Sequence, residues 1–134
     1  ISQPLLDRID LCAEVAKVPY EALVDQTEEE SSETIQKRVV KAREIQKKRY
    51  QTMGIHTNSQ LNVKQIEEIC VLDEASKKLM EQAFERMGLT ARSYHKVLSV
   101  ARTIADLDEA EKIEVKNLRE ALSYRTMNLK YWRK

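Results

Sequence analysis

Glycine and proline constrain this chain most, because both are nearly absent. The 134 residues include two of each, and the glycines, Gly54 and Gly88, stand far apart. Tight hairpin turns depend on these residues, so the sequence favours helices over a fold rich in β-hairpins. The same scarcity excludes from this chain the glycine-rich loops GxxxxGKT and GxGxxG, which cradle phosphates.

Composition limits the class of protein further. The length suits one compact domain, and 33 residues of Leu, Ile, Val and Phe are enough for a real core. The 23 basic residues nearly cancel the 22 acidic ones, so a case for nucleic acid must rest on a local patch. No apolar run approaches the roughly 20 residues that a membrane span needs, and we expect no membrane partner.

Cysteine and histidine give no sign of a metal site. Cys12, Cys70, His56 and His95 are scattered, whereas zinc ligands usually come in closely spaced pairs. We therefore expect no metal ligand here, and two buried thiols in a reducing, cytoplasmic setting. The chain opens on Ile1 without a methionine, from which we expect it to be part of a longer protein.

Residues 9–15 alternate apolar and polar side chains and predict a strand, the one convincing strand of the chain. A strand needs neighbours for its backbone groups, so we expect the rest of its sheet to lie upstream. The other predicted elements are helical. They are short turns at 4–8 and 19–24, a long helix at 32–50, and helices at 63–71, 74–87, 91–107 and 114–125, with a polar loop at 51–61.

The predicted fold is mainly α: a helical bundle preceded by a long helix and one remnant core strand. We divide the chain into residues 1–24, a remnant of a preceding core that holds the upstream sheet; 25–61, an acidic link with the long helix and loop; and 62–134, a helical bundle, which is the lid domain in the family resemblance given below. Caps set the helix bounds, with Asn62, Asp73 and Thr90 at starts and Gly88 at an end. A narrow apolar stripe runs along the long helix. It comprises Ile35, Val39, Ala42, Ile45 and Arg49.

Two strings carry a family resemblance. They are Ser2-Gln-Pro-Leu-Leu-Asp-Arg-Ile-Asp-Leu11 and Gly88-Leu-Thr-Ala-Arg-Ser-Tyr-His-Lys-Val-Leu-Ser-Val-Ala-Arg-Thr-Ile-Ala-Asp-Leu107. They closely resemble the C-terminal part of magnesium-chelatase-related AAA+ ATPases, best the ComM/YifB-like branch, and the resemblance covers essentially the whole chain. The second string is the specific one. Gln3 departs from the pattern, where glycine is expected, and this could alter the turn that leads to Arg8.

The resemblance implies an ATP-driven ring motor, usually hexameric, which uses ATP with Mg²⁺ and has a helical lid. Arg8 looks like the arginine finger that reaches a neighbouring subunit's nucleotide, and Arg92 looks like the lid's sensor-2 arginine on the ATP phosphates. A planar guanidinium can meet two oxygens of a γ-phosphate, which lysine cannot. The Walker segments belong to the core, so we expect the chain alone to bind no ATP tightly and to hydrolyse none.

Each arginine has an alternative reading. Arg8 could simply pair with Asp7 or Asp10, and Arg92 could be an ordinary solvated helix residue. Arg102 and Asp106 are four residues apart and predict a structural ion pair.

The long helix is basic, and Lys37, Arg38, Lys41 and Lys48 could contact phosphates of DNA threaded by the ring. The alternative is a solvated face balanced by the acidic link. The tail at 131–134, with Tyr131 and Trp132, could stack on bases or cover an apolar patch. Two further readings of the whole chain stay open: a stand-alone nucleic-acid-binding helical domain, and a protein-interaction bundle. A true chelatase subunit is a variant within the family.

Overall fold

The computed structural model describes residues 2–13, 15, 17, 19–24 and 29–125. The described chain is mainly helical, as predicted. Its elements are α1 (Gln3–Arg8), α2 (Tyr20–Val24), α3 (Ser32–Arg49), the 3-10 turn η1 (Asn58–Gln60), α4 (Val63–Ile69), α5 (Glu74–Met87), α6 (Ala91–Leu107) and α7 (Val115–Ser123). The division of the chain at residues 24 and 61 stays a prediction.

The predicted caps are confirmed, and the helices at 74–87 and 91–107 have the predicted bounds, whereas α4 and α7 are shorter than predicted by two or three residues. The side chains of Asn62, Asp73 and Thr90 each accept a hydrogen bond from the backbone N–H three residues on. Such a cap stabilises a helix by about 1 kcal/mol. α5 ends at Gly88, whose φ of 61° lies in the left-handed region that glycine adopts without strain.

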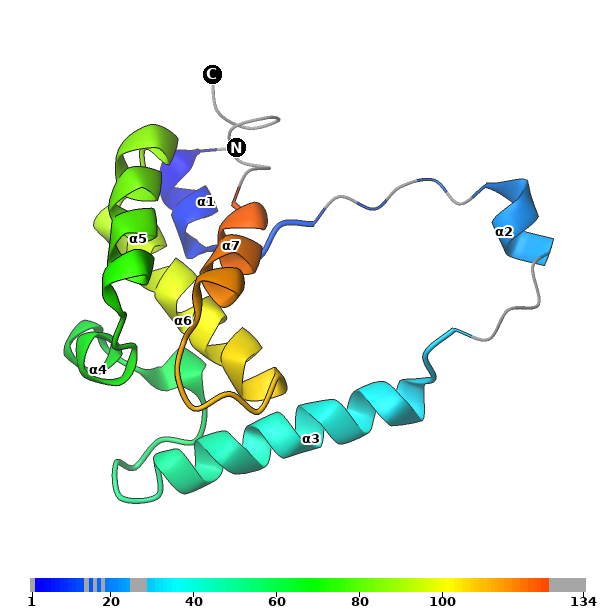
Figure 1. The fold of residues 1–134 in the computed structure, drawn as a ribbon, viewed down its shortest axis with the longest axis horizontal. Helices are drawn as coiled ribbons and strands as arrows, with labels where there is room; N and C mark the ends of the chain where they lie inside the picture. The colour runs from blue at the N-terminus through cyan, green and yellow to red at the C-terminus, as the bar shows by residue number, and fades with distance from the viewer. Residues whose placement is uncertain (1, 14, 16, 18, 25–28, 126–134) are drawn as a thin grey trace.

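Helix α6 is the centre of the bundle, and Figure 1 shows it in yellow between α5 and α7. α1, α3, α4, α7 and η1 all pack against it. The buried core combines apolar side chains of four helices: Ile66 of α4; Met80 and Ala83 of α5; Val97, Leu98, Ala101 and Ala105 of α6; and Leu118, Ala121 and Leu122 of α7. Phe84, which the pattern also placed inward, is 44% exposed, and its ring meets Tyr94 edge-on at the surface.

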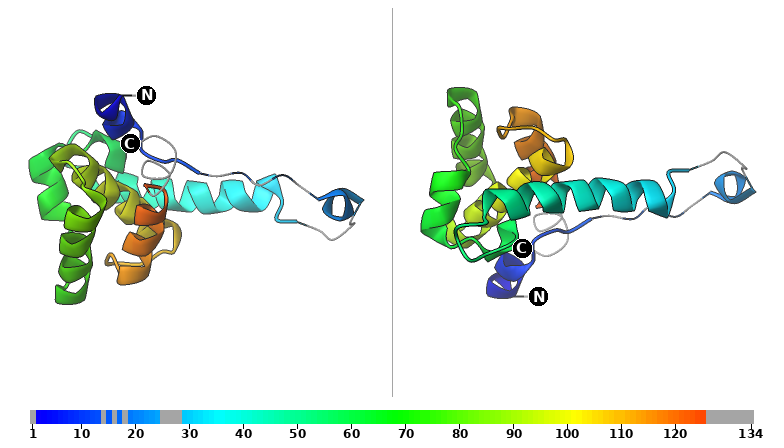
Figure 2. Two further views of the ribbon diagram at one scale, coloured as in Figure 1. Left: turned by 90° about the horizontal axis from the view of Figure 1, so that it is seen from above. Right: turned by 90° about the horizontal axis from the view of Figure 1, so that it is seen from below.

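Only the second half of α3 is packed. Ala42 and Gln46 are buried and Arg49 is partly buried, whereas Ile35 and Val39 on the same stripe are 43% and 39% exposed. The apolar stripe of α3 is therefore covered only over its second half by the described residues. Figures 1 and 2 show the reason: the first turns of α3 project past the end of the bundle. α2 also lies apart from it.

The strand predicted for residues 9–15 is not formed. Residues 9–13 and 15 are in no strand, and residue 14, like the link at 25–28 and the tail at 126–134, lies outside the described residues. Cys12 instead donates its backbone N–H to the Tyr124 carbonyl, 3.2 Å away. The physical reason is that a strand needs a second strand, and the described residues offer none.

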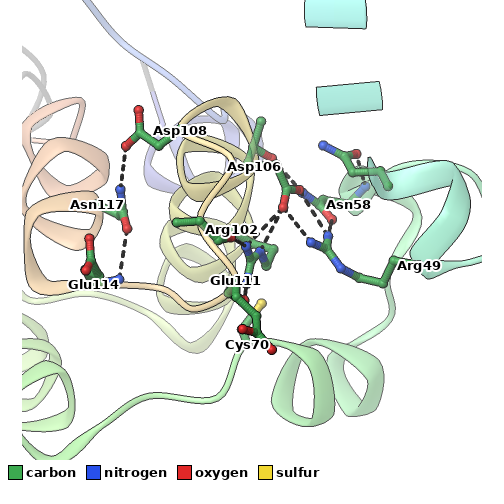
Figure 3. A network of polar contacts seen from close by, with 12 residues as sticks. Arg49, Asn58, Cys70, Arg102, Asp106, Asp108, Glu111, Glu114 and Asn117 are labelled. Atoms are coloured by element: carbon green, nitrogen blue, oxygen red, sulfur yellow. Dashed lines mark hydrogen bonds and ion pairs between the residues drawn. The ribbon is translucent and has the colours of Figure 1, made fainter. Parts of the chain in front are cut away.

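A buried carboxylate ties α3 to α6. The side chain of Asp106 is 0% exposed, and it accepts hydrogen bonds from Arg49, Arg102 and Asn58 (Figure 3). The Arg49 guanidinium forms a bidentate ion pair with Asp106 and donates to its two carboxylate oxygens at 2.5 and 3.0 Å. The predicted Arg102–Asp106 pair is confirmed, but it is buried and shared rather than a solvated pair on a helix surface.

The surroundings of this network are polar and satisfied. The hydroxyl of the fully buried Tyr50 donates to Asn58, and Arg102 donates to the carbonyls of Ala110 and Glu111 at 2.8 and 3.0 Å. Burial alone would lower the pKa of Arg49, but its hydrogen bonds to Asp106 and Tyr50 raise the pKa above its ordinary value. The Arg49 guanidinium therefore stays charged in the folded protein.

We predict that Asp106→Ala destabilises the fold by about 3–5 kcal/mol, because it leaves two guanidinium groups buried without a counter-charge. Urea unfolding followed by circular dichroism measures this. Glu81→Ala, an exposed acid on α5, is the control and should change stability by less than about 0.5 kcal/mol. Equal midpoints for the two variants would contradict the prediction.

Candidate functional site

The end of α1 meets the start of α6. Leu6 and Asp7 are 1% and 7% exposed, and the Asp7 carboxylate accepts a hydrogen bond from the Thr90 hydroxyl at 3.1 Å. Thr90 is also the cap of α6. The two segments that carry Arg8 and Arg92 are therefore joined by direct contact, although more than 80 residues separate them in the sequence.

The extended segment after α1 continues along the same face. Lys96 of α6 forms an ion pair with Asp10 at 2.6 Å, and the backbone of Cys12 is hydrogen-bonded to Tyr124 after α7. Arg125 donates from Nη1 to the Leu6 carbonyl at 3.2 Å. Residues 6–12 are thus held to both α6 and the end of α7.

Both predicted arginines are exposed. Arg8 is the last residue of α1, and Arg92 is the second residue of α6. Within the described part of the chain, neither side chain has an ion pair. The pairing of Arg8 with Asp7 or Asp10 is not seen, since those acids bind Thr90 and Lys96. The two guanidinium groups are therefore available to an outside anion.

A cavity of about 750 Å³ opens beside Arg92. Arg92 and Lys96 line it together with His95, and apolar side chains such as Leu61, Ile66 and Val100 make up much of its wall. The His95 side chain is 18% exposed, and its ring meets that of Tyr94 edge-on at 5.5 Å, so it packs on the flank of the helix. The site therefore combines cationic groups with an apolar wall.

The basic face of α3 is largely paired within the chain. Lys37 lies 3.5 Å from Glu33, Arg38 lies 2.8 Å from Glu30, and Lys41 lies 3.4 Å from Glu109. These are exposed pairs, worth little in stability, and an anionic partner could replace the acids. Lys48, the fourth predicted cation, is exposed near the end of the helix. The structure does not bring these four residues next to α1.

Sequence reasoning missed Lys96, Thr90 and Arg125 as contacts of the α1 segment. Thr90 was identified as a cap, and a cap hydroxyl has a further lone pair and a proton for a second partner. The other two contacts join residues more than 80 positions apart, and no periodic pattern signals such a pair.

The two thiols differ in burial, and neither belongs to a cluster of metal-ligand side chains within the described residues. The described residues contain no group of three or more His, Cys, Asp or Glu that could hold a metal ion. Cys70 is buried and lies 3.8 Å from the Leu98 carbonyl. Burial raises the pKa of Cys70 to about 11, so the group is a neutral thiol at neutral pH.

The comparisons with known proteins identify the family. Residues 29–125 match the family model described as magnesium chelatase, subunit ChlI C-terminal. The chain belongs to this family. Competence protein ComM of Haemophilus influenzae is 40% identical over 128 residues, which are 95% of this chain and 24% of that protein. The protein YifB of Salmonella typhimurium is 36% identical over 129 residues, which are 96% of this chain and 25% of YifB.

The chain thus spans about a quarter of the length of these relatives. The family match and these relatives confirm the resemblance, and the matched segment contains the second sequence string and the helices α3 to α7. None of the described helices has both the length and the apolar composition needed to cross a membrane.

We predict that Cys70 resists alkylation at pH 8, because its raised pKa keeps the thiolate fraction very small and burial blocks access. Mass spectrometry after iodoacetamide treatment measures this, with the partly exposed Cys12 as the internal reference. Because the pKa of Cys70 is about 11 when folded and 9.0 in the reference state, its contribution to stability should fall as the pH rises from about 9 to 11. Equal labelling of both thiols in the folded protein would contradict the prediction.

Proposed function

We propose that this chain is the lid-containing C-terminal part of a AAA+ ATPase, in which Arg8 acts as an arginine finger and Arg92 as a sensor-2 arginine. The observation that carries the proposal is the pair of exposed guanidinium groups on two elements that contact each other, α1 and the start of α6. Membership of the magnesium chelatase family supports it, and so do the two sequence strings.

The chemistry of ATP hydrolysis explains the choice of residue. Attack by water spreads negative charge over the γ-phosphate oxygens, and a fixed guanidinium stabilises that charge. Arg92 lies in the first turn of α6, where the helix dipole also favours an anion. ATP with Mg²⁺ is the substrate in this proposal, and a core outside this chain supplies the phosphate loop. The chain alone would then hydrolyse no ATP.

The proposed assembly is a ring of identical subunits, usually six, in which Arg8 reaches the nucleotide of the neighbour. An arginine finger supplied by a second subunit makes hydrolysis depend on assembly. Turnover would move the lid and so remodel or translocate a partner. We propose DNA as that partner, because a relative is a competence protein and α3 presents Lys37, Arg38, Lys41 and Lys48 at the surface.

In the intact protein that carries this chain, we predict that Arg8→Ala lowers the kcat of ATP hydrolysis by about 10³-fold, and that Arg92→Ala lowers kcat/KM. Arg8→Lys should recover little, because lysine keeps the charge but loses the planar fork. The measurement is steady-state phosphate release.

The matched control is Arg86→Ala, which removes an exposed arginine at the end of α5. It should match the wild type. If Arg8→Ala and Arg92→Ala both stay within about threefold of the wild type, the proposed roles are wrong. A mixture of two inactive variants tests whether Arg8 acts on the neighbouring subunit. Arg8→Ala subunits keep a working nucleotide site, and subunits that cannot bind ATP keep a wild-type Arg8. If Arg8 acts between neighbours, the mixture should regain ATP hydrolysis that neither variant has alone.

We predict that replacing Lys37, Arg38, Lys41 and Lys48 together by alanine weakens binding of duplex DNA and lowers its salt dependence, by about one unit of slope for each phosphate that is no longer neutralised. Fluorescence anisotropy over a salt series measures both. Lys78→Ala, an exposed cation on α5, is the single-site control. An unchanged slope in the fourfold variant would show that this face is only a solvated surface.

A further inference from the structure

Arg125 is a buried cation with few partners. It is 3% exposed, and Nη1 donates to the Leu6 carbonyl at 3.2 Å. Its other two nitrogens, Nε and Nη2, are buried and have no hydrogen-bond partner within the described part of the chain. Leaving buried donors unpaired costs free energy, so packing alone does not account for a guanidinium here.

The Leu6 carbonyl lies at the end of α1. It also accepts the backbone N–H of Ile9, the residue that caps the helix. Arg125 therefore contributes a positive charge and a donor to the C-terminal turn of α1, where the carbonyls carry partial negative charge. That turn ends at Arg8.

The groups that act electrostatically on Arg125 also belong to the α1 segment and the chain after it. Burial lowers the pKa of Arg125, while the nearby groups Cys12, Asp7 and Asp10 oppose this effect. All of these groups belong to the α1 segment or the extended chain after it. Arg125 thus interacts with that segment, although it follows α7 at the other end of the described chain.

We propose that Arg125 is a positioning residue for Arg8: it fixes the end of α1 to the end of α7, so that Arg8 and the helix carrying Arg92 move as one unit. The Asp7–Thr90 hydrogen bond and the Lys96–Asp10 pair hold the same segment from the side of α6. This inference rests on the proposed function of Arg8 and adds the device that orients it. Arg125 itself touches no nucleotide.

The test uses the intact protein and two separate readouts. Hydrogen–deuterium exchange of peptides covering residues 2–12 reports whether α1 stays docked, and steady-state ATP hydrolysis reports whether Arg8 is oriented. In Arg125→Leu we expect exchange to become about tenfold faster and kcat to fall by about 10- to 100-fold, with KM for ATP unchanged. Arg125→Lys, which keeps a donor for the Leu6 carbonyl, should recover much of both.

Matched variants separate the explanations. Arg119→Leu removes an exposed arginine of α7 and should leave both readouts unchanged. Arg8→Ala should lower kcat without speeding exchange in residues 2–12. If Arg125→Leu fails to fold, Thr90→Asp replaces it as the test variant. Aspartate still caps α6 but has no hydroxyl to donate to Asp7. Thr90→Ser is its control, because serine keeps both the cap and the donor. Thr90→Asp should then speed exchange and lower kcat, and Thr90→Ser should change neither.

Each outcome is decisive. If Arg125→Leu behaves as Arg119→Leu does in both readouts, or speeds exchange while kcat is unchanged, Arg125 does not position Arg8 and the inference is overturned. If Arg8→Ala leaves kcat unchanged, the proposed function of Arg8 fails, and the positioning role of Arg125 falls with it. Faster exchange and lower kcat in Arg125→Leu, with recovery in Arg125→Lys, support the inference.

Discussion

The carboxylate of Asp106 is the interaction on which the arrangement of this chain depends. A fully buried charge is tolerated only where its partners are fixed, and here Arg49, Arg102 and Asn58 come from α3, α6 and η1. The geometry therefore specifies where α3 joins the bundle and at which point of α6. Apolar packing alone would let α3 slide along α6, because hydrophobic contacts have no preferred direction.

Helix α6 connects the buried Asp106 network with the candidate site. Asp106 lies near its C-terminal end and Arg92 in its first turn, 14 residues apart, which corresponds to about 21 Å along a helix. One end of α6 is tied to α3, and the other end holds α1 through Thr90 and Asp7. A motion of the bundle would therefore carry both ends together, which is what a lid needs in order to couple nucleotide chemistry to a partner.

Local chemistry explains what the sequence could predict and what it could not. The caps Asn62, Asp73 and Thr90 act within three residues, so the points at which their helices begin were predictable. The exposure of Ile35 and Val39 could not be predicted in this way. A periodic stripe shows which face of a helix is apolar but not whether another element covers that face. The contacts of Arg125 with α1 join the two ends of the described chain and leave no local signal.

Two features of the described residues fit a neighbouring domain outside this chain. The stripe of α3 that is buried at Ala42 continues without a break to the exposed Val39 and Ile35, and residues 9–13 run extended with the alternating pattern of a strand. An apolar helix face is stabilised when another element covers it, and an extended strand is stabilised when its backbone groups pair with a neighbouring strand. A core domain ending in a sheet would supply the strand's partners, and the relatives have about three quarters of their length outside the matched segment. The proposed ATPase accounts for the extended segment, because its core would supply the backbone partners that a stand-alone helical domain lacks.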